Sequence, residues 1–355
     1  MHHTAWFAMT FDIALWLVQD GITNGAIYAL LALALLLVFA VTRIIFVPQG
    51  EFISYAALSL ALLEAGRLPG TVYVLVIGGF IAAAFDSARA LRERAWRRLP
   101  RILALYVLLP LVMAGITWWA VPQKLALWLH VLIVLGLVVP LGPILYRVAY
   151  RPLASASVLV LFIVSMAAHY VLTGLGLVFF GGEGLRAPPF SDAQFKLGVL
   201  TITAQSLLVI AATLFIMVLL WRLFDRTVYG KALRATAVNR VGARLVGIPT
   251  DLSGSLSFAL AAFIGAVSGI LIAPITTIYY DTGFLIGLKG FVGAILGGMG
   301  SYPLAALGAL GLGMFESFAS FWASAYKEVI VFTIMIPVLV WRSLTSHHPV
   351  EDEEE

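Results

Sequence analysis

The sequence predicts an all-α integral membrane protein, a polytopic bundle of about eight to ten transmembrane helices that forms a single domain over residues 1–355. Two observations predict this class. The chain is 62% hydrophobic and only 11% charged, whereas about a quarter of the residues of a soluble domain carry a charge. The apolar residues also fall into runs, several of them near the roughly 20 residues that one crossing needs. An ordinary soluble domain is therefore excluded.

The apolar runs follow one another along the whole chain. The first, residues 13–41, is longer than one crossing needs, and it lacks the basic start and the cleavage site of a signal peptide. Polar, Gly or Pro residues separate each run from the next. The later runs cover residues 51–63, 71–85, 102–120, 125–145, 158–180, 201–221, 255–273, 284–299, 302–318 and 329–341.

Basic residues predict which loops face the cytoplasm. The loop 86–101 contains six arginines, which assigns it to the cytoplasm. Two further crossings return the chain to the same side at Arg147 and Arg151, so the polar segment 181–192 lies outside. The next crossing leads to the longest polar connection, residues 222–254, on the cytoplasmic side. The net charge of +4 is thus explained by topology, without a nucleic-acid partner.

Glycine is dense in residues 283–301, which are short for a full crossing. Such a sequence predicts a broken or re-entrant helix, because irregular backbone at membrane depth is tolerated against protein or an aqueous cavity. The alternative is that small residues let two helices approach closely. Whether this segment crosses completely decides the side of the charged tail, residues 342–355, which stays open.

Several kinds of chemistry are excluded. Without cysteine the chain has no disulfide and no thiolate site. It has no G-x-x-x-x-G-K-[ST] phosphate loop and no H-E-x-x-H metal motif, so we expect no catalytic, cofactor or metal site on this chain. His169 lies inside an apolar run, where we interpret it as bonded to a helix neighbour, with a substrate contact as the alternative.

Polar residues inside a membrane are costly and tend to face a pathway or another helix. Glu51 could equally be an acid at a helix N-terminus, and Lys289 could pair with Glu316 across the bundle. The candidate substrate pathway consists of Asn24, Tyr28, Gln49, Glu51, Ser54 and Lys289.

The cytoplasmic segment 230–248 has helical periodicity. Leu233, Ala237, Val241 and Leu245 recur every fourth residue, and glycines bound the segment. The pattern predicts one short amphipathic helix. Such a helix is suited to a groove of a partner protein, or to the inner leaflet through its arginines.

The same segment resembles the coupling segment of the branched-chain amino acid ABC transporter permeases of the high-affinity leucine, isoleucine and valine uptake type. Further stretches agree with this family in order along the chain. They are N-G-A-I-Y-A-L at residues 24–30, Q-G-E-F at 49–52, Y-R-P-L at 150–153, and L-K-G-F with L-G-G-M-G-S at 288–301, followed by Gly308, Gly313 and Glu316.

The sequence also departs from the family pattern. F-V-P at residues 46–48 replaces the usual Asn-Phe-Ala, and Val238 and Arg240 replace a common acidic residue and proline. Ser165, His169 and Val171 stand where small residues and glutamine are usual. Residues 66–125 resemble an inserted pair of spans. These differences suggest a divergent branch.

The resemblance implies a permease subunit of an ABC importer with a type II importer fold, multi-pass in the bacterial inner membrane. It would move branched-chain amino acids or related small polar or carboxylate solutes by alternating access. The implied partners are a second homologous permease, two cytoplasmic ATPase subunits that hold ATP and Mg, and an extracytoplasmic substrate-binding protein. The implied coupling residues are Gly230, Leu233, Arg234, Ala235, Ala237, Asn239, Val241, Arg244 and Gly247.

A second hypothesis is a stand-alone secondary transporter or channel. An ion gradient would then drive transport through groups such as Asp20, Glu51 or Glu316. The cargo also stays open among leucine-like amino acids, amides or urea, and small aromatic or carboxylic acids.

Overall fold

The computed structural model describes residues 11–345 except 124, 155, 198–199 and 299. The tail at 346–355 therefore lies outside the described residues. The helices are α1 Phe11–Thr42, α2 Glu51–Glu64, α3 Thr71–Arg92, α4 Leu99–Leu103, α5 Leu109–Ala120, α6 Leu127–Val138, α7 Leu141–Leu145, α8 Val158–Phe180, α9 Ala204–Arg226, α10 Val228–Val238, α11 Arg240–Leu245, α12 Thr250–Ile272, α13 Thr282–Gly297, α14 Tyr302–Ala323, α15 Lys327–Thr333 and α16 Met335–Thr345. Strands β1 Gln194–Leu197 and β2 Leu200–Thr203 form an antiparallel hairpin.

The predicted membrane bundle is confirmed. Within the described residues, eight helical stretches are long and apolar enough to cross a bilayer. α2 and α13 are shorter, with 14 and 16 residues. At 1.5 Å per residue, α13 is about 24 Å long, somewhat less than the roughly 30 Å of a hydrocarbon core.

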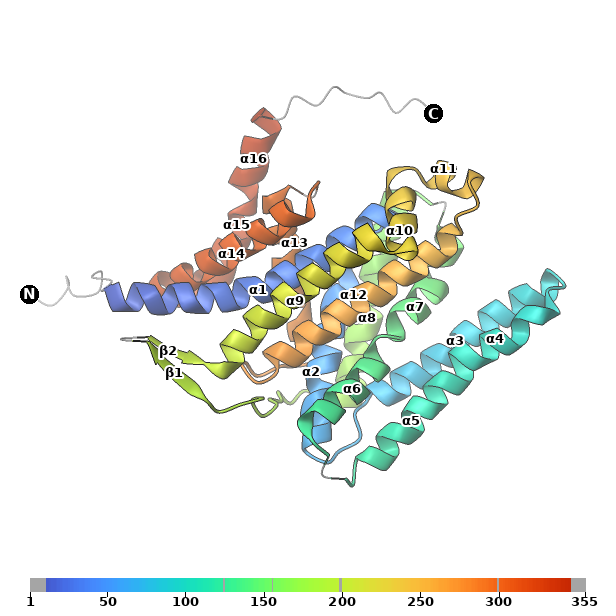
Figure 1. The fold of residues 1–355 in the computed structure, drawn as a ribbon, viewed down its shortest axis with the longest axis horizontal. Helices are drawn as coiled ribbons and strands as arrows, with labels where there is room; N and C mark the ends of the chain where they lie inside the picture. Colours follow the sequence, from blue (N-terminus) through green and yellow to red (C-terminus); the bar gives the residue numbers. More distant parts are fainter. Residues whose placement is uncertain (1–10, 124, 155, 198–199, 299, 346–355) are drawn as a thin grey trace, which may run out of the picture.

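α1 is the central helix of the bundle. It runs beside α9, α12 and α14, with the β hairpin at one end and α10 and α11 at the other (Figure 1). Glycines permit this burial: a Cβ on Gly25 would lie 2.9 Å from the Leu310 backbone, and one on Gly313 would lie 2.4 Å from the Gly25 backbone. Close contact through small residues stabilises helix association in membranes, where apolar burial between helices gives no driving force.

The glycine-rich segment near the C-terminus forms a continuous helix. α13 is unbroken from Thr282 to Gly297 and ends where Gly298 adopts a φ of +93°. The prediction of a broken helix is therefore wrong for Thr282–Gly297, and whether this helix is re-entrant stays a prediction. The alternative explanation holds, because a Cβ on Gly283 or Gly290 would clash with Gly50 or with Leu31.

The irregular backbone lies instead between α1 and α2. Residues 43–46 are not helical, Arg43 has a φ of +61°, and a 3₁₀ turn, Val47–Gly50, leads into α2. Pro48 in this turn has no N–H for a helical bond. Gln49 and Gly50 are buried, so the interruption lies against protein, where such backbone is tolerated.

The segments predicted as cytoplasmic loops are largely helical. α3 continues to Arg92, and the connection 222–254 holds the end of α9, α10, α11 and the start of α12. α3, α4 and α5 lie at the edge of the bundle (Figure 1). α3 packs on α6, α7 and α8, and α5 packs on α6. The origin of residues 66–125 as an insertion stays a prediction.

Candidate functional site

The interruption before α2 brings together three of the six candidate pathway residues, Gln49, Glu51 and Ser54. All three are fully buried. Glu51 begins α2, as expected for an acid at a helix N-terminus. Its Oε1 lies 2.5 Å from Nδ1 of His169 on α8, and its Oε2 has no hydrogen-bond partner among the described residues. The interpretation of Glu51 as a helix N-terminal acid is confirmed, and its place in a substrate pathway stays a prediction.

His169 is held from several directions. Its Nδ1 also lies 3.4 Å from Oγ1 of Thr173, a neighbour one turn along α8. The imidazole stacks on Phe284 of α13, with 4.2 Å between ring centroids and 26° between planes. The predicted helix neighbour is present, but the shorter contact is the one to Glu51. His169 therefore links α8 to both α2 and α13.

Gln49 and Ser54 connect the interruption to two further helices. Gln49 Nε2 donates to the Ala261 carbonyl of α12 at 3.0 Å, whereas its Oε1 has no partner among the described atoms. Ser54 Oγ accepts the N–H of Gly283 at 2.8 Å and donates to the Tyr279 carbonyl at 3.2 Å. The site at 49–54 is thus enclosed by α8, α12 and α13.

A second polar group joins α1, α13 and α14. Lys289 Nζ donates to Glu316 at 2.6 Å and to Glu328 at 2.9 Å, and Tyr28 OH donates to Glu316 at 2.7 Å. The predicted pair of Lys289 and Glu316 is confirmed. Glu328 on α15 was missed from the sequence, although it is an acid at the start of an apolar run.

Asn24, the remaining candidate, lies one helical turn before Tyr28 on α1. Its Nδ2 donates to Asp20 at 3.3 Å, and Ser317 of α14 also donates to Asp20 at 3.3 Å. The six candidates therefore divide into two groups, Gln49, Glu51 and Ser54 in one, and Asn24, Tyr28 and Lys289 in the other. The structure does not bring them into one cluster.

The segment 230–248 is two helices, so the prediction of one amphipathic helix is wrong. Asn239 has an extended backbone between α10 and α11, and its side-chain Oδ1 accepts the N–H of Gly242 at 2.7 Å. Asn is among the preferred N-cap residues. The apolar line is broken there: Leu233 is fully buried, whereas Val241 is 69% and Leu245 83% exposed.

α10 is anchored to the bundle by its buried face. Leu233 packs with Leu37 and Val41 of α1, and Thr236 donates to Ser253 of α12 at 3.1 Å. Gly230 lies against the backbone of Leu223, where a Cβ would come within 2.0 Å. Ala235 and Ala237 are half-buried on this helix.

The arginines and Gly247 shape the rest of the segment. Arg234 donates to the Phe224 carbonyl at the end of α9 and lies 3.6 Å from Asp225. Arg244 donates to Thr250 at 2.9 Å, and Gly247, with a φ of +85°, ends the turn after α11. These bonds hold α10 and α11 on the bundle, while Val241 and Leu245 of α11 stay exposed.

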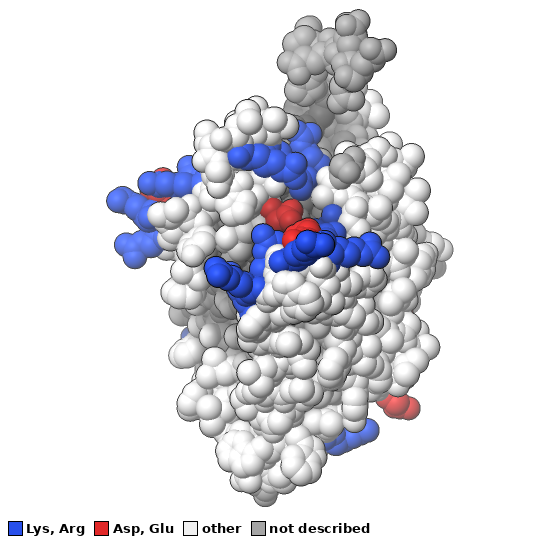
Figure 2. Space-filling model, turned by 90° about the vertical axis from the view of Figure 1, so that its right-hand side faces the viewer, with Lys and Arg blue, Asp and Glu red and all other residues white. Residues whose placement is uncertain are grey.

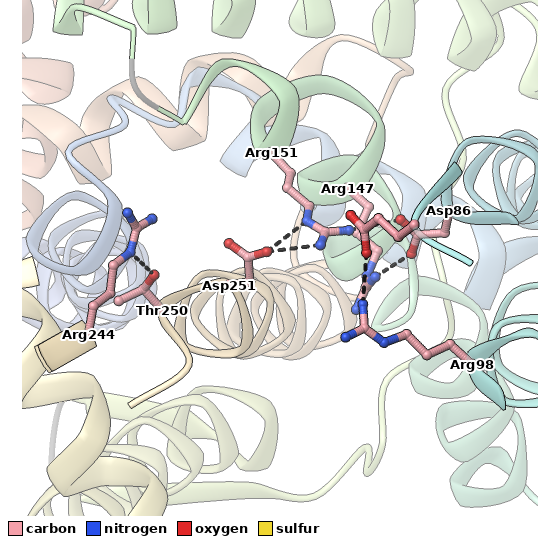
Figure 3. Close-up of polar contacts among 8 residues, drawn as sticks. Asp86, Arg98, Arg147, Arg151, Arg244, Thr250 and Asp251 are labelled. Atoms are coloured by element: carbon pink, nitrogen blue, oxygen red, sulfur yellow. Dashed lines mark hydrogen bonds and ion pairs between the residues drawn. The ribbon is translucent and has the colours of Figure 1, made fainter. Parts of the chain in front are cut away.

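Basic side chains gather at this end of the molecule, with acidic groups between them (Figure 2). Asp86 of α3 is paired with both Arg147 and Arg151 in the turn before α8. Arg151 also bonds Asp251 at the start of α12 at 2.9 Å (Figure 3). The same-side placement of the basic loops that the parity of crossings predicts is therefore observed.

A sequence model described as "Branched-chain amino acid transport system / permease component" matches residues 17–339. The chain belongs to this permease family. The permease is 26% identical to the high-affinity branched-chain amino acid transport system permease protein LivH of Escherichia coli (strain K12) over 331 residues, 90% of this chain and 91% of LivH. It is 32% identical to the corresponding protein BraD of Pseudomonas aeruginosa over 203 residues, 55% of this chain and 66% of BraD.

A probable branched-chain amino acid transport permease protein LivH of Methanocaldococcus jannaschii is 31% identical over 228 residues, 60% of the permease and 71% of that relative. No solved structure matches the chain. Membership in the family makes the protein a multi-pass transport subunit of an ABC transporter rather than an enzyme, and a component of a larger transporter complex.

Proposed function

We propose that the permease carries branched-chain amino acids, or related small polar or carboxylate solutes, from an extracytoplasmic binding protein into the cytoplasm by alternating access. It would act in the bacterial inner membrane with a second homologous permease and two ATPase subunits. The observation that carries this proposal is the exposed α11. Its side chains Val241 and Leu245 are exposed, and α11 lies at one end of the bundle, where an ATPase would dock (Figure 1).

The contacts of α10 and α11 give a route for mechanical coupling. Arg244 and Thr236 bond the first turn of α12, through Thr250 and Ser253. α12 in turn holds Gln49 through the Ala261 carbonyl. A displacement of α11 by an ATPase would therefore be passed along α12 to the buried interruption before α2, the group where Glu51 and His169 meet.

The coupling assignment is tested by reconstituting the permease with its ATPases and binding protein in proteoliposomes. The double variant Val241→Asp and Leu245→Asp places charge on the exposed face without disturbing buried contacts. We expect ATP-driven uptake to fall at least tenfold while the thermal unfolding temperature is unchanged. Trp96→Asp, on an exposed residue of the basic loop, is the matched control and should keep uptake. Unchanged uptake in the double variant would contradict the assignment.

Charge reversal at Arg234 and Arg244 tests the same surface. We expect it to separate ATP hydrolysis from uptake, because both guanidinium groups hold the segment on the bundle. Arg244→Glu is the cleaner variant, since Arg234 also binds the last turn of α9. Transport at the normal rate in the double reversal would count against the proposal.

The permease alone in proteoliposomes should be inert with and without an ion gradient. Uptake that needs no ATPase would instead support the stand-alone transporter. A ligand screen on the purified binding protein, with leucine, amides, urea and small aromatic acids, identifies the cargo.

A further inference from the structure

An apolar groove opens between α1, α9 and the start of α14, at the end of the bundle that carries the basic loops. Its volume is about 450 Å³, and its walls include Leu33, Leu37, Met217, Trp221, Tyr302 and Pro303. The ring of Tyr302 stacks on Phe224 at 5.6 Å between centroids and forms part of the floor. A groove of this volume with mostly apolar walls suits a hydrocarbon chain better than a polar solute.

The groove and the hollow beside it share a basic rim. Arg234 lines the groove, and its side chain is 55% exposed. Arg222 and Arg226 line a second hollow that shares Trp221 with the groove. Among the described residues that line the two hollows, Asp225 is the one carboxylate, and it contacts both Arg226 and Arg234. Three arginines against one aspartate leave the shared rim of the two hollows with a net positive charge.

The depth of the groove matches the boundary of a membrane leaflet. Trp221 and Tyr302 are amphipathic aromatic residues of the kind enriched where the hydrocarbon core meets the headgroups. The arginines follow within one or two turns of α9, and basic residues predict the cytoplasmic side. The apolar walls therefore face the acyl region, and the guanidinium groups lie at headgroup level.

We propose that this groove binds an anionic phospholipid of the inner leaflet, with an acyl chain along α1 and α9 and the phosphate at Arg222 and Arg226. Basic pockets between helices on the cytoplasmic side are suited to anionic headgroups. A second copy of this chain would bring the same basic rim against this one, which charge repulsion opposes. Because Arg234 belongs to α10, the bound lipid also contacts the coupling segment.

The test is lipid binding to the purified, delipidated full-length chain, measured by native mass spectrometry during titration with dioleoyl phosphatidylglycerol or dioleoyl phosphatidylcholine. We expect the anionic lipid to bind at least fivefold more tightly. Arg222→Gln with Arg226→Gln should remove most of that preference and leave phosphatidylcholine binding unchanged. The matched control, Arg92→Gln with Arg97→Gln, removes the same charge from the basic loop and should change the preference less than twofold. Equal binding of both lipids, or an equal loss in the control, would overturn the proposal.

Three further measurements separate this lipid from other occupants. Val218→Trp places a large ring at the half-exposed wall of the groove and should weaken phosphatidylglycerol binding even though no charge changes. Inorganic phosphate should fail to compete, whereas full competition would indicate a site for free phosphate instead. Because the chain has no cysteine, Val218→Cys gives a single thiol. Efficient disulfide cross-linking of two copies through this thiol would show that the groove is a protein interface. That result would overturn the lipid assignment.

Discussion

Glu51 Oε1 lies 2.5 Å from Nδ1 of His169, although 118 positions separate the two residues in the chain. Both side chains are buried, and this contact joins α2 to α8. The contact exists because the backbone breaks before α2, so that the first turn of α2 faces the middle of α8. Leaving either group buried without its partner would cost free energy, which makes the pair a direct test of this packing.

A double-mutant cycle measures the pair. His169→Phe leaves a buried carboxylate without its partner, so we expect the free energy of unfolding to fall by about 3 kcal/mol. Glu51→Gln keeps a polar group beside His169 and should cost about 1 kcal/mol. The double variant should be more stable than the sum of the two losses by about 1–3 kcal/mol, measured by unfolding in detergent. Additive losses would mean that the two side chains are not coupled.

Gly50 allows α2 and α13 to touch. A Cβ at this position would lie 2.1 Å from the Gly283 carbonyl oxygen, so Gly50→Ala must push the two helices apart. We expect a loss of about 1–3 kcal/mol. Gly174→Ala on α8 is the matched control, since nothing lies within 4 Å of the added methyl group. It should leave stability unchanged or raise it by about 0.5–1 kcal/mol. Equal melting temperatures for the two variants would be incompatible with this contact.

Asp86 ties the edge helices to the rest of the bundle. Its side chain is 8% exposed and bonds two arginines, so Asp86→Asn should destabilise the protein by about 3 kcal/mol. The exposed pair of Glu93 and Arg98 is the control, and Glu93→Gln should cost less than about 1 kcal/mol. Hydrogen exchange of α3 and α5 should rise in the first variant only. Equal exchange in both would show that these helices do not depend on Asp86.

Asn239 separates α10 from α11. Asn239→Ala removes the acceptor for the Gly242 N–H, which should lower the stability of α11 by about 1 kcal/mol. Because α11 has only six residues, its other helical hydrogen bonds are too few to compensate. We expect faster amide exchange in α11 and less uptake per ATP hydrolysed. Asn239→Asp keeps an acceptor and should behave like the original protein. If both variants lost coupling equally, the cap would not be the reason.

Lys289 neutralises two carboxylates, those of Glu316 and Glu328. Lys289→Met should therefore destabilise the bundle by about 3–5 kcal/mol. Adding Glu316→Gln removes one uncompensated charge and should recover at least half of that loss. Recovery of stability together with normal uptake would assign the group a structural role. Stability without uptake would place it in the pathway, and a double variant no more stable than Lys289→Met would contradict the pairing.

The sequence alone determined much of the architecture because the relevant signals are local. The near absence of charge, the length of the apolar runs and the position of the arginines predict a helical membrane bundle and the side of its basic loops. The ordered family motifs predict a permease. The Lys289–Glu316 pair could also be predicted from the sequence, because two opposite charges in neighbouring apolar runs have few other partners.

The tertiary structure decided which distant groups meet and where helices break. The pairings of Glu51 with His169 and of Asp86 with Arg151 depend on how helices pack, which periodicity does not report. The amphipathic line from Leu233 to Leu245 continued through Asn239, yet the side-chain cap at Asn239 ended one helix and began another. Glycine density near α13 had two explanations, and the close approach of Gly283 to Gly50 selected helix contact over a break. Each of these outcomes rests on atoms far apart in the chain, or on a competition between a local hydrogen bond and a helical pattern.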